Sequence, residues 1–352
     1  MAGLEGRHVV VTGAGRGIGK AIALRLAREG ARLSLLARGV DALHATAAEA
    51  GGAFVQQLDI RDAEQVERAF AGAAEANGPV HALVANSGIG GPNEAGPGDR
   101  FLDLVATNLV GTYSCVRAAQ RRLADGTERR DVVVISSILA RIGVSGYTGY
   151  CASKAGLLGL VRSLAAELAP ENVQVNAICP GWVDTNMAWE GIDLLAAAIG
   201  GTREDAYAQA MSEVPLRRMS APEDIAGTVA WLLSPDARGV TGQAIDQNGG
   251  AFMPRSRARE EQAEPADDRR KRERNPVGGR ARDRAARRRA GDRAERPRGV
   301  HEPERHPLRQ PRRLGAVREQ RERRREQRPP CEAGEHDQRH VGERAAAGGE
   351  AE

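Results

Sequence analysis

Aromatic and sulfur-containing residues are scarce in this chain. Only 3% of its 352 residues are Phe, Trp or Tyr, and its four cysteines are Cys115, Cys151, Cys179 and Cys331. The cysteines show neither the spacing of a disulfide framework nor that of a metal-ligand set. The first seven residues lack the apolar core of a secretion signal, and no apolar run is long enough to span a membrane. We therefore expect a cytoplasmic protein with neither a metal site nor a membrane segment.

Large apolar side chains are also missing from the last part of the chain. Residues 255–352 contain no Ile, Phe, Tyr, Trp or Met, and they hold 29 of the 51 Lys and Arg residues and 20 of the 47 Asp and Glu residues. So few apolar groups cannot form a core, which predicts a disordered Arg/Glu/Pro/Gly-rich tail after a single folded domain over residues 1–254. The mixed charges and the absence of stacking aromatics make nucleic-acid binding by this tail the least favoured of its roles, behind an extension without function and an interaction tail.

The chain opens with a pattern of strand, glycine turn and helix. Val9–Val11 is a short apolar strand, Thr12–Gly19 reads Thr-Gly-Ala-Gly-Arg-Gly-Ile-Gly, and apolar residues at helical spacing then run up to Gly30. In this context glycines let backbone N–H groups and a helix N-terminus approach a pyrophosphate. A glycine turn that binds nothing would explain such a motif almost as well when it stands alone.

The end of the second strand bears on the choice of cofactor. Leu33–Ala37 is followed by Arg38, where an NAD-binding chain usually places Asp or Glu to hold the ribose hydroxyls. A guanidinium suits a 2′-phosphate, and Arg16 lies in the glycine turn. The sequence thus favours NADP(H) over NAD(H), unless both arginines are merely solvated surface charges.

Three residues in the middle of the chain suggest acid–base chemistry. Tyr150 and Lys154 are four positions apart, so in a helix they share one face. A neighbouring ammonium stabilises a phenolate and lowers the tyrosine pKa from about 10. Ser137 lies thirteen residues before Tyr150, just after the apolar run 132–135, and we expect it at the mouth of a parallel sheet.

Ser137 followed by Tyr150-x-x-x-Lys154, together with the Thr-Gly-x-x-x-Gly-x-Gly turn, resembles the short-chain dehydrogenase/reductase family. The similarity is greatest to its 3-oxoacyl-thioester and polyketide-type ketoreductases, and it covers about residues 5–254 with six motifs in the family's order. It implies an α/β, Rossmann-like, doubly wound sheet of seven parallel strands with helices on both faces. It also implies that residues 1–254 form one dinucleotide-binding and catalytic domain. One departure is Ala85-Asn86-Ser87-Gly88, where the family usually has Asn-Asn-Ala-Gly.

The resemblance assigns roles to residues that the chain's own pattern leaves open. Asp59 would hydrogen-bond the adenine edge, although an acidic residue there could also cap the next helix. Asn108 would kink its helix and anchor a water that links the lysine to solvent, although it could equally be hydrogen-bonded within a helix interface. In the turn that starts at Pro180, the backbone of Val183 would meet the carboxamide and Thr185 would reach the pyrophosphate. The cofactor contacts implied are Gly13, Gly15, Arg16, Gly17, Ile18, Gly19, Arg38, Asp59, Ile60, Asn86, Gly88, Tyr150, Lys154, Pro180, Gly181, Val183 and Thr185.

The resemblance further implies an enzyme that transfers a hydride between a nicotinamide and a carbonyl or secondary alcohol. Ser137 would orient the carbonyl oxygen, Tyr150 would protonate it, Lys154 would lower the tyrosine pKa, and Asn108 would complete a proton relay. The expected substrate is a small molecule such as a 3-oxoacyl thioester or another ketone. A secondary-alcohol or hydroxyacyl-CoA dehydrogenase is the alternative, and an NADP(H)-sensing regulator is a third. The helix after Tyr150 is apolar on more than one face, which suggests a homotetramer or homodimer.

Overall fold

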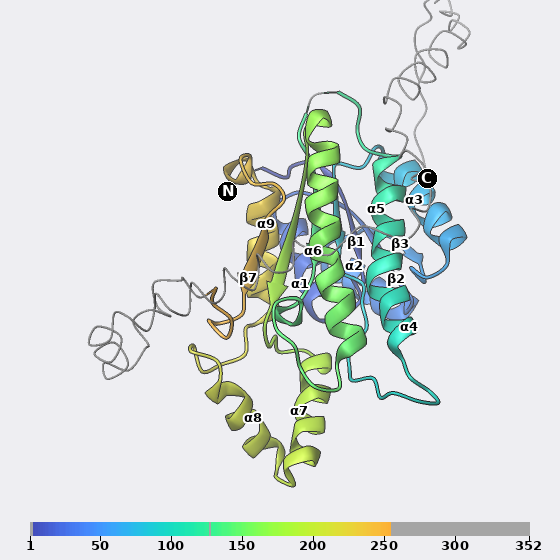
Figure 1. Ribbon diagram of the computed structural model, residues 1–352. Helices are drawn as coiled ribbons and strands as arrows, with labels where there is room; N and C mark the ends of the chain where they lie inside the picture. Colours follow the sequence, from blue (N-terminus) through green and yellow to red (C-terminus); the bar gives the residue numbers. More distant parts are fainter. Residues whose placement is uncertain (1–2, 127, 255–352) are drawn as a thin grey trace, which may run out of the picture. The chain divides into compact units, whose positions relative to one another are not determined.

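The computed structural model describes residues 3–126 and 128–254 of the chain. They contain one seven-stranded sheet in the order β3-β2-β1-β4-β5-β6-β7, and every neighbouring pair is parallel (Figure 1). The strands are β1 (His8–Thr12), β2 (Arg32–Ala37), β3 (Phe54–Gln57), β4 (Ala82–Ala85), β5 (Arg130–Ile135), β6 (Val173–Pro180) and β7 (Ala244–Gln247). The predicted Rossmann-like sheet is confirmed. Its order reverses between β1 and β4, which is where sheets of this kind bind their ligands, at the carboxyl ends of the strands.

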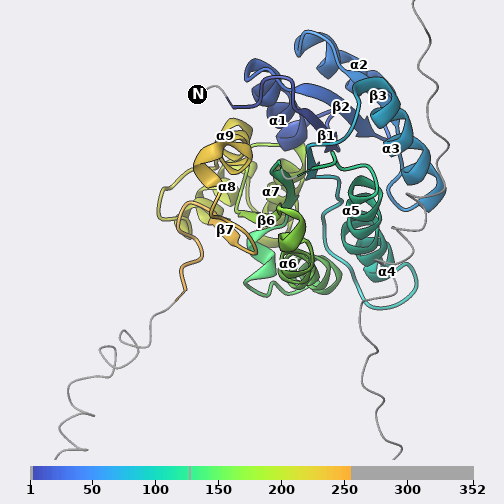
Figure 2. The same ribbon diagram turned by 90° about the horizontal axis from the view of Figure 1, so that it is seen from above.

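Helices cover both faces of the sheet (Figure 2). Strand side chains alternate between the faces, so that Val9 and Val11 join one buried cluster and Val10 joins the other. The first cluster is covered by three helices, α1 (Gly17–Arg28), α2 (Val40–Glu49) and α9 (Pro222–Leu233), whose apolar side chains pack into it. The second receives α3 (Ala63–Asn77), α5 (Thr112–Gln120) and α6 (Thr148–Leu168). Short 3-10 turns lie at Ile138–Ala140, Ala169–Glu171 and Pro235–Ala237.

The helical run from Phe101 to Gln120 is interrupted. The helix α4 (Phe101–Val105) passes into a π-helical segment, Ala106–Gly111, which continues directly into α5. Short π-helical stretches inside α-helices often mark functional sites. This one contains Asn108, the residue for which the sequence predicts a kink.

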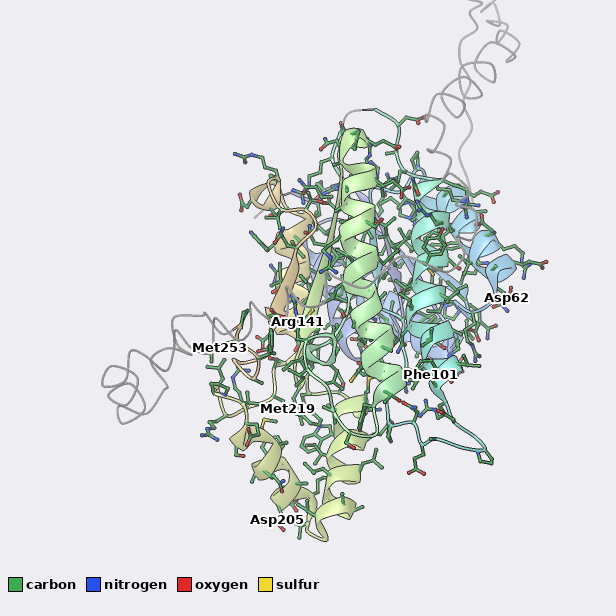
Figure 3. All side chains as sticks on the ribbon, viewed as in Figure 1. Asp62, Phe101, Arg141, Asp205, Met219 and Met253 are labelled. Atoms are coloured by element: carbon green, nitrogen blue, oxygen red, sulfur yellow. The ribbon has the colours of Figure 1, made fainter. Side chains whose placement is uncertain are left out.

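Two helices lie beyond the carboxyl ends of the strands. They are α7 (Asn186–Ile199) and α8 (Arg203–Ser212), which form a separate small core around Ile192, Met211 and Met219 (Figures 1 and 3). The rings of Trp189 and Tyr207 stack with their centroids 5.7 Å apart. Residues 187–211, whose sequence has mixed helical character, are therefore helical over most of their length.

A buried cluster of charged side chains lies at the amino-terminal ends of the strands. Asp131, whose side chain is 2% exposed, accepts hydrogen bonds from Arg7 Nη2 and from Arg129 Nε, both at 2.8 Å. Arg7 also donates to the Leu233 carbonyl at 2.7 Å, and Arg129 donates to the Ser234 carbonyl at 2.6 Å. The cluster therefore ties the start of the chain, the start of β5 and the end of α9 together.

The helix α2, which was not among the predicted elements, separates β2 from β3. The predicted disordered tail, residues 255–352, lies outside the described residues. In the described part of the chain, no helix has the length and hydropathy needed to cross a bilayer.

Candidate active site

The glycine turn lies against the end of β4. A Cβ atom on Gly19 would lie 2.1 Å from the Gly13 carbonyl oxygen, so no side chain fits there. Gly13 itself has φ +68°, which is unfavourable for other residues. Asn86 donates from Nδ2 to the Gly13 carbonyl at 3.2 Å, and the Thr12 hydroxyl accepts the N–H groups of Asn86 and Ser87, both at 3.1 Å. The Thr12 hydroxyl thus holds together the two loops that the sequence assigns to the cofactor.

The loop after β6 reaches the same turn. Gly17 has φ +52°, and a Cβ there would lie 3.2 Å from the Thr185 methyl group. Val183 is buried and forms a bridge with Ser220, and Gly181 packs against the backbone of Asn248. Thr185 caps α7 by accepting from the Ala188 N–H at 3.4 Å. The turn predicted from Pro180 to Thr185 therefore lies beside the glycine turn, as a shared cofactor site requires.

The residues predicted for the adenine end are only partly brought together. Arg16 is the N-cap of α1 and Arg38 follows β2, where its carbonyl accepts from Gln57 Nε2 at 2.9 Å. The carboxylate of Asp59 accepts from Arg61 Nη2 at 2.6 Å and from the Arg61 backbone N–H at 3.0 Å. These contacts, chiefly the side-chain hydrogen bond from Arg61, lower the pKa of Asp59, and the charge of Arg38 adds to the effect.

Arg61 was not among the predicted site residues, and it also donates to the Asp103 carboxylate on α4 at 3.0 Å. Ile60 and Gly15 pack closely into the fold. A Cβ on Gly111 would lie 2.7 Å from Ile60, and one on Gly15 would lie 3.0 Å from Ala42 of α2. Ile18 packs against the cluster beneath α1.

The residues predicted to act in catalysis, Ser137, Tyr150 and Lys154, lie at the carboxyl end of β5 and in the first turns of α6. Asn93, from the loop before α4, fixes the start of this helix by accepting the Gly149 N–H at 2.8 Å and donating to the Thr148 hydroxyl at 2.9 Å. Tyr150 and Lys154 share one face of α6, with Lys154 Nζ 5.7 Å from the centre of the tyrosine ring. Asn93 was not predicted, because the sequence shows only that it lies in a Gly/Pro-rich loop.

Lys154 is buried between β5 and the loop after β4. Its side chain is 5% exposed, and Nζ donates to the Ile135 carbonyl at 3.1 Å. A Cβ on Gly88 would lie 3.4 Å from Nζ and 3.0 Å from Asn108 Oδ1, so the absence of a side chain there lets these groups converge. The glycine-turn side of the site and the acid–base side therefore meet at Gly88.

The pKa of Tyr150 differs from the sequence-based expectation. Burial raises it above its ordinary value, and a hydrogen bond with the Ser137 side chain offsets only part of this rise. Burial also lowers the pKa of Lys154 to about 8. Spacing correctly placed the ammonium beside the phenol, but in this structure desolvation dominates the pKa values of both groups. The expected lowering of the tyrosine pKa is therefore not observed.

Asn108 is fully buried and holds the loop after β4. Its Oδ1 accepts the Ile89 N–H at 2.9 Å, and its Nδ2 donates to the Ile89 carbonyl at 3.0 Å and to Ser153 Oγ at 3.1 Å. Both amide hydrogens are used within the protein. Its predicted role as the anchor of a relay water stays a prediction.

The residues present fit a nicotinamide dinucleotide. Gly13 and Gly17, both with positive φ, are partly exposed beside the start of α1, and a helix N-terminus of this kind suits a pyrophosphate. The Ser137 side chain lies near enough to Tyr150 to lower its pKa, so the two hydroxyl groups, next to Lys154, could both face a carbonyl oxygen. In the described residues no group of three or more His, Cys, Asp or Glu side chains could hold a metal ion.

Comparison with known proteins agrees with this geometry. Residues 13–251 match the family model described as enoyl-(acyl carrier protein) reductase. The chain is 33% identical over 249 residues to the 3-oxoacyl-[acyl-carrier-protein] reductase MabA of Mycobacterium tuberculosis, covering 70% of this chain and 93% of that protein. It is 37% identical over 258 residues to the L-rhamnose 1-dehydrogenase (NAD(P)(+)) of Azotobacter vinelandii, covering 70% and 97%.

A solved structure is also similar to this chain. A variant of actinorhodin polyketide ketoreductase, crystallised with NADPH, superposes with a TM-score of 0.66 at 34% identity and covers 71% of this chain and 99% of that one. The family match over residues 13–251 includes the glycine turn from Gly13 onward and the Ser137, Tyr150 and Lys154 cluster. The chain belongs to the short-chain dehydrogenase/reductase family of oxidoreductases, which act on keto and alcohol groups.

Proposed function

We propose that the chain reduces a 3-oxoacyl thioester or a related ketone with NADP(H). The observation that carries the proposal is the convergence of Ser137, Tyr150 and Lys154 next to Gly88, at the end of the sheet where the glycine turn also lies. When bound, the nicotinamide supplies the hydride. Ser137 donates a hydrogen bond that orients the carbonyl oxygen, and Tyr150 donates the proton that this oxygen takes up. Lys154 provides the positive charge beside the phenol.

The similar proteins support reduction as the direction of the reaction. The mycobacterial relative is a 3-oxoacyl-[acyl-carrier-protein] reductase, and the actinorhodin protein is a ketoreductase crystallised with NADPH. The rhamnose dehydrogenase relative acts in the oxidative sense, and its name permits either cofactor. Secondary-alcohol oxidation is therefore the second candidate to be tested.

An absorbance assay at the nicotinamide band separates the candidates. Purified full-length chain would be mixed with NADPH and a panel of 3-oxoacyl thioesters and simple ketones, and separately with NADP⁺ and secondary alcohols, 3-hydroxyacyl-CoA and L-rhamnose. We expect the highest kcat/KM with a ketone or thioester. Faster turnover of an alcohol would favour the alternative, and cofactor binding without any turnover would favour a sensor.

Arg38 is proposed as the residue that selects NADPH. It follows β2 close enough to Asp59 for its charge to act on that carboxyl group, at the end of the site opposite Lys154. A guanidinium–phosphate contact contributes about 1.5–3 kcal/mol, so Arg38→Asp should lower kcat/KM for NADPH by roughly 10- to 100-fold and leave NADH use equal or improved.

The matched control is Arg28→Asp, which makes the same charge change on an exposed arginine at the far end of α1. It should leave the ratio of NADPH to NADH use within about twofold. If the unmodified chain uses NADH as well as NADPH, the NADP(H) assignment fails.

We also propose a homotetramer or homodimer in the cytoplasm. Apolar side chains stand exposed along α4, the π-helical segment and α5, with Leu102 77%, Val110 53% and Tyr113 43% exposed. Such a row is a candidate contact between copies. Light scattering on the purified chain measures the assembly directly, and a monomer at micromolar concentration would contradict the proposal.

A further inference from the structure

Lys154 is held at two points by consecutive residues at the end of β5. Its Nζ donates to the Ile135 carbonyl at 3.1 Å, and its own backbone carbonyl accepts from the Ser136 hydroxyl at 2.9 Å. Ser136 is 4% exposed and Lys154 is 5% exposed, so neither contact competes with water. The next residue, Ser137, contacts Tyr150 one helical turn earlier in α6.

The Ser136 contact is a tether additional to the helix's own hydrogen bonds. Lys154 lies in the interior of α6, Thr148–Leu168, where each carbonyl already accepts from the N–H four residues later. Helix formation therefore does not require the serine hydroxyl at this carbonyl. The serine itself is fixed, because its N–H donates to the Ile178 carbonyl of β6 at 2.8 Å and its side chain contacts the Cys179 thiol.

We propose that Ser136 is a positioning residue that locks α6 against β5 and so keeps the Lys154 ammonium beside Tyr150. Its hydroxyl group acts through the backbone carbonyl of Lys154. The expected effect on turnover rests on the proposed reductase function, whereas the expected effect on the titration of Lys154 does not.

A buried serine could instead serve stability alone, and Ser34 is the matched control for that reading. Ser34 on β2 is fully buried, and its hydroxyl is bonded to His8 Nε2 at 2.8 Å and to Asn77 Nδ2 at 3.0 Å. Removing either hydroxyl takes a buried hydrogen bond from the sheet. Of these two serines, only Ser136 contacts Lys154.

The composition of the chain allows a direct readout without substrate or cofactor. The full sequence contains only three lysines, Lys20, Lys154 and Lys271, so each ¹³Cε signal of a lysine-labelled sample can be assigned by substitution. Lys154 should titrate with a pKa of about 8. In Ser136→Ala the freed side chain gains access to water, so we expect its midpoint to rise by at least about 0.5 pKa unit. Ser34→Ala should leave it unchanged.

The kinetic readout should agree with the titration. Ser136→Ala should lower kcat by roughly tenfold to a hundredfold, because small displacements of a reacting group are costly. Ser136→Thr keeps the hydroxyl and should restore both kcat and the titration midpoint, whereas Ser34→Ala should lower only the melting temperature.

An unchanged Lys154 midpoint in Ser136→Ala, or an equal shift in Ser34→Ala, would overturn the proposal. If Ser136→Ala does not fold, Ser136→Thr decides, since a displaced midpoint there would contradict the tether. If the parent chain reduces no ketone, the proposed function fails while the lysine titration still tests Ser136.

Discussion

Replacing Tyr150 by Phe is expected to lower kcat by about 10³-fold while the cofactor still binds. The phenol is the proton donor of the proposed reaction, and positioned general acids contribute about 10²- to 10⁴-fold. Because Phe keeps the ring, the packing around α6 and the position of Lys154 should persist. The loss should therefore fall on the chemical step and not on the affinity for NADPH.

The measurement pairs steady-state kinetics with a cofactor titration by nicotinamide fluorescence. Tyr113→Phe is the matched control, because it removes the same hydroxyl from a half-exposed tyrosine on α5. It should retain kcat within about twofold. A Tyr150→Phe enzyme that keeps a tenth or more of the parent activity would refute the assignment of Tyr150 as the acid.

Replacing Asp131 by Ala should destabilise the protein by about 3–5 kcal/mol, the usual cost of removing one partner from a buried ion pair. The carboxylate is 2% exposed and bonded to two arginines, Arg7 and Arg129, which are themselves only 18% and 15% exposed. Without it, two guanidinium groups remain together at the end of α9 with no counter-charge. For a domain of this size, the melting temperature should fall by roughly 10 °C.

Calorimetry or urea unfolding would measure this effect, and Arg68→Ala is the control. Arg68 pairs with Glu64 on the surface of α3, with side chains 62% and 87% exposed, and its loss should cost less than about 0.5 kcal/mol. Comparable losses in the two variants would show that the Asp131 cluster adds nothing beyond a surface pair. The cofactor affinity of Asp131→Ala should stay near that of the parent at temperatures where both are folded.

The glycine turn and individual strands could be predicted because their signals are local, and the family resemblance implied the seven-stranded parallel sheet. Apolar runs bounded by turn residues predicted the strands. The glycine turn has a recognisable pattern because glycine cannot be replaced where a Cβ atom would meet the Gly13 carbonyl oxygen, as at Gly19. The spacing of Tyr150 and Lys154 is likewise a property of one helix. Each of these features can be recognised from a few consecutive residues.

The supporting contacts could not be predicted, because they join segments that are distant in the sequence. Asn93 caps α6 across 56 residues, and Ser136 reaches Lys154 across 18. Nothing in the residue types around either position distinguishes them from ordinary loop and strand residues. The pKa of Tyr150 was wrongly predicted for a related reason: spacing shows that a charge is near, but burial depends on the whole fold.

Because of the π-helical segment, the number of residues between α4 and α5 determines where the Asn108 side chain lies. A π turn holds about one residue more than the α-helical turn it replaces. Deleting a single residue between Ala106 and Asn108 would favour an uninterrupted α-helix and rotate the Asn108 side chain by about 100° relative to α5. The loop through Gly88 and Ile89 would then lose its anchors, although every residue of the acid–base set would still be present in the sequence.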